Sequence, residues 1–240
     1  GGYRGSLPVA ILAGGLATRL RPVTERVPKS LIEIAGRPFI FHQLELLKRQ
    51  GIGRVVLCVG YLGDQVKAAV GDGRALGLSV DYSFDGDLLL GTGGSLKRAL
   101  PLLGEVFFVL YGDSYLPCSF ADVQLAYEAA GCPALMTVLR NNGRWDKSNV
   151  LYRDGVIVQY NKRSPRPDMA HIDYGLEVLA ASVFEWHRDG QPFDLADTLQ
   201  ELSLKGELAG FEIGERFYEI GSHQGIKETE SFISEREDKE

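Results

Sequence analysis

Short apolar runs alternate with amphipathic stretches along the first half of the chain. Runs with the length and β-branched composition of buried strands lie at residues 8–13, 54–60, 80–84 and 106–111. Stretches with a helical spacing of apolar residues lie between them, at 39–50, 63–70 and 95–100. This alternation predicts βαβ units, and hence a Rossmann-like, mostly parallel sheet that is covered by helices on both faces.

The second half of the chain has a more mixed pattern. Helices are predicted at 119–130, 194–206 and 222–237, and strands at 134–140 and 172–180. Residues 149–162 alternate around Asp154-Gly155, which is the turn signal of a β-hairpin. We therefore expect one α/β domain over residues 7–236, whose later strands widen the sheet into a mixed one. Residues 1–6 (GGYRGS) resemble the remnant of an expression tag and are set aside.

Net charge, apolar runs and cysteines narrow the range of partners. With a formal net charge of -6, the chain lacks the basic surface of a general nucleic-acid binder. No apolar run approaches the roughly 20 residues that span a bilayer. The three cysteines have no metal-type spacing, which suits reduced thiols. We expect a cytoplasmic protein with a local site for a small anion, and no nucleic-acid or membrane partner.

A glycine corner with positive charges follows the first predicted strand. Gly14 and Gly15 end the apolar run, and Arg19 and Lys29 follow within fifteen residues. Glycines let backbone amides approach a phosphate closely, because no Cβ intervenes. The spacing fits neither the P-loop pattern GxxxxGK[ST] nor the dinucleotide pattern GxGxxG. On sequence alone, a strand-ending turn with solvated arginines stays an alternative to an anion cradle.

Two further features favour the anion cradle. A second glycine loop, Gly91–Gly94, opens another predicted helix, where backbone amides and the helix dipole favour an anion or a base edge. The very apolar run 106–111 is followed by Gly112 and Asp113. A carboxylate at the carboxyl end of a strand, beside a cationic phosphate cradle, is where a Mg²⁺ ligand is expected.

The stretch LAGGLATRLRPVTERVPKSLIEIAGRP at residues 12–38 resembles the signature of sugar-1-phosphate nucleotidyltransferases. GTGG, YGD, YNK, YGLEV and FYEIG extend the resemblance over almost the whole chain. Within the family, the chain is most similar to the D-glycero-D-manno-heptose 1-phosphate guanylyltransferase branch. The resemblance implies a GT-A-like fold of the nucleotide-diphospho-sugar transferase type. It implies a nucleotide-binding half at about 7–118 and a sugar-binding half at about 119–236, without a C-terminal left-handed β-helix domain.

The resemblance also implies a reaction and the residues that carry it. A sugar 1-phosphate would attack the α-phosphorus of a nucleoside triphosphate, with GTP as first choice and Mg²⁺ as cofactor, and pyrophosphate would leave. Arg19, Lys29 and Asp113 would carry the chemistry. The nucleotide contacts implied are Leu12, Ala13, Gly14, Gly15, Thr18, Arg19, Lys29, Thr92, Gly93 and Gly94.

The implied sugar contacts come from the second half of the chain, and the implied metal ligands come from both halves. Lys162 would grip the sugar phosphate, and Asn161, Gly175 and Glu177 would line the sugar pocket, with Glu177 accepting from hydroxyl groups. Asp113 and Glu219 would hold Mg²⁺. Three positions depart from the family pattern: Ala17 stands where glycine is usual, Asn161 stands where glutamate is common, and Glu219 replaces the more usual aspartate. Glu219 is therefore the least secure of the metal ligands.

The sequence alone leaves several alternatives open for the substrate, the functional class and the role of Trp145. A UTP- or dTTP-dependent enzyme shares the same N-terminal signature, and a CTP-dependent phosphocholine-type enzyme is the nearest rival activity. A non-catalytic nucleotide-sugar sensor is the alternative class, although such a protein would be expected to lose Arg19, Lys29 or Asp113. Trp145 would serve either as a lid over the sugar or as a cover for a core edge. A homo-oligomer would have to form through the α/β body.

Overall fold

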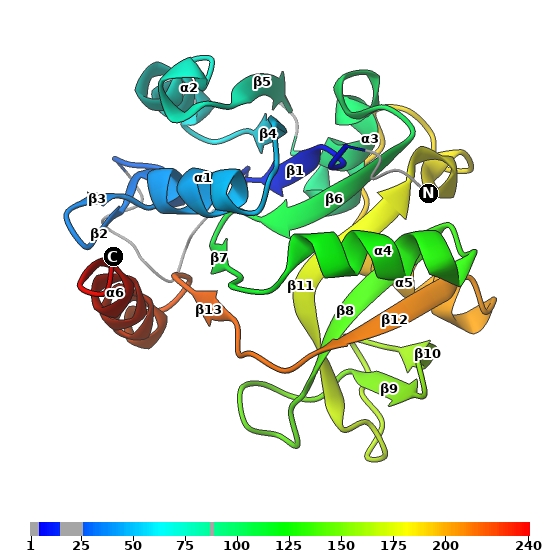
Figure 1. The fold of residues 1–240 in the computed structure, drawn as a ribbon. Coiled ribbons are helices and arrows are strands. Elements are labelled where there is room, and N and C mark those ends of the chain that lie inside the picture. Colours follow the sequence, from blue (N-terminus) through cyan, green and yellow to red (C-terminus); the bar gives the residue numbers. More distant parts are fainter. Residues whose placement is uncertain (1–4, 15–25, 87–88) are drawn as a thin grey trace.

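In the computed structural model, which describes residues 5–14, 26–86 and 89–240, nine strands form one central sheet. Four parallel strands occupy one end of it, in the order β5 (Ser79–Phe84), β4 (Arg54–Val59), β1 (Val9–Leu12) and β6 (Val106–Tyr111). The apolar runs of the first half of the chain thus form the predicted parallel strands (Figure 1).

The other end of the sheet is mixed. β11 (His171–Ala180) is antiparallel to both β6 and β8 (Ala134–Arg140), and β12 (Leu208–Ile213) runs parallel to β8. The hairpin of β9 (Val150–Arg153) and β10 (Val156–Tyr160) closes this edge. Asp154 and Gly155 both have positive φ, as a two-residue hairpin turn requires. The prediction of a mostly parallel, mixed sheet is confirmed.

β12 was not predicted, and Gly210 in its centre explains why. A glycine inside a short run weakens the strand signal. In the structure, a Cβ at Gly210 would lie 2.7 Å from Ile157 Cδ1 and 2.8 Å from Tyr152 Cε2. The glycine is therefore needed where the hairpin packs against β12, a requirement that local sequence does not reveal.

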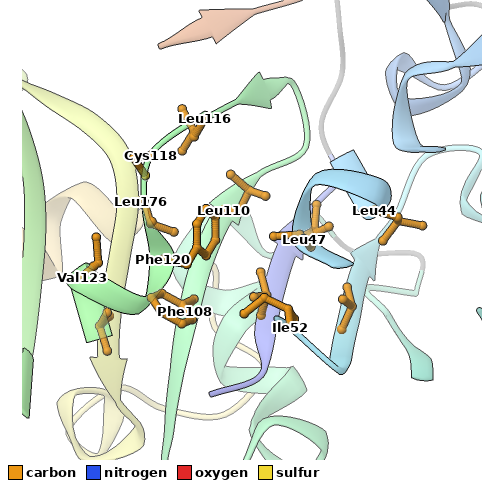
Figure 2. Packing of buried hydrophobic residues seen from close by; sticks show 14 of the residues in the cluster. Leu44, Leu47, Ile52, Phe108, Leu110, Leu116, Cys118, Phe120, Val123 and Leu176 are labelled. Atoms are coloured by element: carbon orange, nitrogen blue, oxygen red, sulfur yellow. The ribbon is translucent and has the colours of Figure 1, made fainter. Parts of the chain in front are cut away.

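Helices cover both faces of the sheet. α1 (Phe39–Arg49), α2 (Gly63–Val70) and α4 (Phe120–Ala130) contribute to one apolar cluster, and α3 (Gly91–Leu103) and α5 (Leu195–Leu204) contribute to another. Alternate strand residues divide between the two clusters: Phe108 belongs to the first and Phe107 to the second. Figure 2 shows the first cluster, with Leu44 and Leu47 from α1 and Phe120 from α4. This two-sided burial explains why β6 is almost wholly apolar.

A third, smaller cluster connects the C-terminal segment to the body. It contains Ile34, Phe39, Tyr115, Ile220 and Ile233, all buried. It packs α6 (His223–Glu237) beside the short pair β2 (Glu33–Ile34) and β3 (Arg37–Pro38). β13 (Tyr218–Glu219) pairs with β7 (Ser114–Tyr115), which places Glu219 opposite Ser114. The end of the chain thereby reaches the carboxyl end of β6 (Figure 1).

Three 3-10 helices complete the described elements: η3 (Lys29–Leu31), η4 (Arg74–Leu76) and η5 (Ala181–Phe184). Ser119, Asp194 and Ser222 accept backbone N–H bonds at the N-termini of α4, α5 and α6. Within the described residues, no helix has both the length and the apolar character that a membrane span requires.

Candidate active site

Three strands of the parallel end, β1, β4 and β6, finish side by side at glycines. A Cβ on Gly14 would lie 3.1 Å from the Gly60 nitrogen, and one on Gly112 would lie 2.8 Å from the Leu12 oxygen. Ala13 N–H donates to the Cys58 oxygen, and Gly112 N–H donates to the Leu12 oxygen. The predicted nucleotide contacts Leu12, Ala13 and Gly14 thus lie at the ligand-binding edge of the sheet. Gly15, Thr18 and Arg19 lie outside the described residues.

Lys29, Asp113 and Glu219 meet at this edge. Lys29 Nζ donates to Asp113 Oδ2 over 3.3 Å, and both side chains are partly exposed. A Cβ on Gly221 would lie 3.0 Å from Glu219 Oε2, 3.2 Å from Asp113 Oδ2 and 3.8 Å from Lys29 Nζ. The three head groups therefore surround one glycine. Their segments are far apart in sequence, and the pairing of β7 with β13 brings the last of them into place.

Glu219 is held in place by the residues that lead into α6. Its Oε2 accepts from Gly221 N–H, and its Oε1 accepts from Ser222 Oγ at 2.7 Å. A Cβ on Gly225 would lie only 2.0 Å from Oε1, so the position of the carboxylate requires a glycine there. Each carboxylate oxygen accepts two bonds readily, so these contacts leave capacity for a cation.

The donor set fits Mg²⁺. Two carboxylates converge on Gly221, and Mg²⁺ is usually held by one or two carboxylates together with waters and substrate phosphates. Among the described residues, no group of three His, Cys, Asp or Glu side chains could hold a metal ion without such help. Asp113 and Glu219 would therefore share a metal ion with the substrates.

A cleft of about 960 Å³ extends from this cluster across the sheet. Its lining includes Lys29, Asp113 and Glu219 at the metal end, and Lys162, Gly175 and Asp173 farther along. Tyr111 and Tyr160 also line it, and burial together with nearby carboxylates raises the pKa of both phenols. Both hydroxyls therefore stay protonated and can donate. A cleft that joins cations, carboxylates and hydroxyl groups suits a phosphorylated, hydroxyl-rich ligand.

Glu177 does not line this cleft. Its side chain is fully buried, and neither carboxylate oxygen has an N–H or O–H donor among the described residues. The sequence-based expectation that Glu177 accepts directly from a sugar hydroxyl therefore does not match its position. The reason is a bulge in β11 at Gly175, where φ is +106°. Asp173, which the sequence reasoning missed, faces the cleft instead.

Asn161 has a local structural contact. Its Oδ1 accepts from Arg163 N–H at 3.2 Å and from Ser164 N–H at 2.9 Å, which makes an Asx turn after β10. The turn sets the direction of the chain on either side of Lys162, which is exposed and lines the cleft. A direct contact between Asn161 and a sugar stays a prediction.

The GTGG sequence is the first turn of α3 and not an open loop. The N–H groups of Gly93 and Gly94 donate to the Phe193 oxygen at 3.0 and 3.3 Å, and Thr92 Oγ1 donates to Asp194. A Cβ on Gly93 would lie 2.1 Å from the Phe193 ring. These glycines therefore allow the segment before α5 to pack on α3. Thr92 also lines the cleft, and a nucleotide role for Thr92, Gly93 and Gly94 stays a prediction.

Trp145 and Arg216 form part of the cleft wall. The Arg216 guanidinium lies 4.1 Å from the centre of the Trp145 ring and 4.2 Å from that of Tyr218. Trp145 also packs against the first apolar cluster, with its ring centre 6.0 Å from that of Phe217. Trp145 thus covers a core edge and borders the cleft at once. Arg216 had no distinguishing sequence signal, because its role depends on these ring contacts.

In an open α/β sheet of this class, ligands bind at the carboxyl ends of the strands, which is where Lys29, Asp113 and Glu219 meet. Residues 9–141 match the model of the family described as nucleotidyl transferase, and the chain belongs to that family. A D-glycero-alpha-D-manno-heptose 1-phosphate guanylyltransferase of Campylobacter jejuni subsp. jejuni is 30% identical over 88% of this chain and 93% of its own length.

Other known proteins are similar to this chain over different shares of their own length. A UTP–glucose-1-phosphate uridylyltransferase of Synechocystis is 29% identical over 79% of this chain, which spans only 53% of that relative. The crystal structure of HddC from Yersinia pseudotuberculosis superposes with a TM-score of 0.80 at 22% identity, and covers 95% of this chain and 99% of HddC. The GT-A-like nucleotidyltransferase fold expected from the sequence is thereby confirmed.

Proposed function

We propose that the chain transfers a nucleotidyl group from a nucleoside triphosphate to a sugar 1-phosphate. The observation that carries the proposal is the convergence of Lys29, Asp113 and Glu219 on Gly221, at one end of a cleft that continues to Lys162. The membership of the nucleotidyl transferase family supports the same reaction class. Three free cysteines support a cytoplasmic location.

The reaction needs positioning and charge more than proton transfer. A phosphate oxygen of the sugar 1-phosphate forms a bond to the α-phosphorus, the bond from that phosphorus to the bridging oxygen breaks, and pyrophosphate leaves with the electron pair. The nucleophile is already an anion, so no general base is required. When bound at Asp113 and Glu219, Mg²⁺ would supply positive charge to the phosphate oxygens.

Residues along the cleft would bind the two substrates and neutralise their negative charge. Lys29, and Arg19 by resemblance, would neutralise the triphosphate as charge moves onto the leaving pyrophosphate. Lys162 would bind the phosphate of the sugar, and Gly175 would let the sugar approach the strand backbone. The nucleotide and the sugar would thus meet beside Asp113.

GTP and a heptose 1-phosphate are the first choice of substrates. The C. jejuni relative, whose full length the chain nearly spans, is named for these two. Other relatives are named for uridylyl and thymidylyl transfer, and a solved neighbour is an inositol-1-phosphate CTP transferase, so UTP, dTTP and CTP are the alternatives.

The test is an activity matrix. The protein is incubated with Mg²⁺, each of the triphosphates GTP, UTP, dTTP and CTP, and a panel of heptose, mannose and glucose 1-phosphates, and pyrophosphate release is measured. GTP with the heptose is expected to give the highest kcat/KM. Asp113→Asn should abolish turnover, and Asp81→Asn, at an exposed site on β5, serves as the matched control. Nucleotide binding without turnover for any pair would favour the sensor class instead.

A further inference from the structure

A bulge in β11 brings two carboxyl groups together behind the cleft. Asp173 lies opposite Val138 and Glu177 opposite Met136, so β11 has two more residues than β8 between these pairs. Thr137, the residue between the two partners on β8, is buried. Its Oγ1 donates to the Leu176 oxygen at 2.6 Å and accepts from Leu176 N–H at 3.3 Å. These bonds satisfy the backbone N–H and C=O of Leu176 within the bulge.

Asp173 and Glu177 have different environments. Asp173 reaches the cleft, and its Oδ1 accepts from Gly175 N–H at 2.9 Å. Burial raises the pKa of Asp173, while the hydrogen bonds from Glu177 and Gly175 and the positive charge of Lys162 act to lower it. Glu177 is completely buried, and the ionisable groups that interact with it electrostatically are Asp173 on its own strand, Tyr111 of β6 and Tyr160 of β10. None of these three is a cation.

Glu177 is therefore expected to be protonated in the folded protein. An ionised carboxylate that is buried without a donor or a counter-charge is very costly. Burial and the neighbouring Asp173 raise the pKa of Glu177 well above its ordinary value. The two carboxyl groups are close enough for a hydrogen bond, which exists only if one of them is protonated. Because Glu177 is the more buried of the two, its hydroxyl is the donor and the Asp173 carboxylate is the acceptor.

We propose that Glu177 is a positioning residue, whose protonated carboxyl group donates to Asp173 and orients it. Asp173 is then the carboxylate that accepts a hydrogen bond from a hydroxyl group of the acceptor sugar. The inference rests on the proposed function, because it assigns the cleft beside Lys162 to a sugar. Two donors, Gly175 N–H and Glu177, fix Asp173 from behind, and its remaining acceptor capacity faces the cleft.

The kinetic test compares two substitutions of Glu177. Glu177→Gln keeps a donor to Asp173 through its amide, whereas Glu177→Leu keeps the approximate size and removes the donor. We expect Glu177→Gln to leave the KM for the sugar 1-phosphate within about threefold of the parent protein. Glu177→Leu should raise that KM about tenfold, as expected for one lost hydrogen bond, with an unchanged KM for the triphosphate. Equal effects of both variants, or equal effects on both KM values, would overturn the proposal.

A double variant tests whether Glu177 acts through Asp173. Asp173→Ala should itself raise the KM for the sugar 1-phosphate, and adding Glu177→Leu should raise it no further. Independent contributions would instead multiply. A multiplied effect means that Glu177 does not act by orienting Asp173, and it would overturn the assignment.

An infrared measurement tests the proton without any turnover, and it also applies if Glu177→Leu does not fold. The parent protein at neutral pH should show the carbonyl stretch of a protonated carboxylic acid, and Glu177→Gln should lack it. Absence of this band from the parent protein would overturn the inference. Its presence in a protein that shows no activity in the substrate matrix would mean that the proposed function, and not the buried proton, is wrong.

Discussion

Lys29 Nζ lies 3.3 Å from Asp113 Oδ2, and this contact connects the segment after β1 with the end of β6. The two side chains are 27% and 34% exposed. An ion pair at this level of exposure contributes only about 0–1 kcal/mol to stability. The pair therefore provides little stability, and the proposed function gives it another role, with a phosphate at the lysine and a cation at the carboxylate.

Replacing Lys29 by Ala should separate activity from stability. We expect kcat to fall about 10²- to 10³-fold, because a preorganised charge on the leaving group is lost. The free energy of unfolding should change by less than about 1 kcal/mol. Pyrophosphate release and urea denaturation measure the two quantities. Lys205→Ala, which removes a 3.3 Å pair with Glu201 on α5, is the matched control and should change neither greatly. Near-normal turnover of Lys29→Ala would remove Lys29 from the mechanism.

Gly225→Ala should disturb the proposed metal site without replacing a proposed metal ligand. The new Cβ would lie 2.0 Å from Glu219 Oε1 and 2.4 Å from the Glu219 backbone oxygen, so both the carboxylate and the backbone of Glu219 must move. We expect a higher Mg²⁺ concentration for half-maximal activity, similar to that of Glu219→Gln. Alanine is otherwise favoured over glycine inside a helix, so helix propensity predicts the opposite effect. Gly214→Ala, with open space around its Cβ, is the control. An unchanged Mg²⁺ titration for both Glu219→Gln and Gly225→Ala would mean that Glu219 is not a ligand.

Gly93→Ala tests what the GTGG turn is for. Its Cβ would lie 2.1 Å from the Phe193 ring, and we expect a loss of about 1–3 kcal/mol in the free energy of unfolding, as for other overpacked sites. Phe193→Leu makes room, so the double variant should be more stable than the sum of the single effects predicts. Urea denaturation of the three variants provides the comparison. A variant with full stability but weakened triphosphate binding would instead support the nucleotide role expected from the sequence.

The stability of the protein should depend on pH through Glu177. Its pKa in the folded state is raised from the ordinary 4.5, so above that pH the folded state retains a proton that the unfolded state has lost. Stability must then fall as pH rises, until the folded pKa is passed. Glu177→Gln removes this contribution, so its stability relative to the parent protein should grow as the pH rises above 4.5. Exposed Glu207→Gln is the control. A constant difference across this range would contradict a buried proton on Glu177.

Much of the fold can be predicted from short windows of sequence. The strands at β6 and β8 and the helix α2 have the predicted bounds, because their apolar periodicity is a local property. The Asp154-Gly155 turn is equally local, since it depends on two residues that tolerate positive φ. Asp113 could be identified as a site candidate because a carboxylate directly after an apolar strand must emerge at the sheet edge.

The remainder of the site depends on pairings between distant segments. Glu219 reaches Asp113 only because β13 pairs with β7, and Glu177 is buried behind Asp173 only because β11 bulges around Thr137 of another strand. The glycines of the GTGG turn, in turn, face Phe193, about a hundred positions away. Sequence alone determined which segments are apolar and where the chain turns, because apolar periodicity and turn propensity depend on residues only a few positions apart. Which carboxylate faces the cleft was decided by tertiary structure, because strand register and close packing are set by partners that no local window contains.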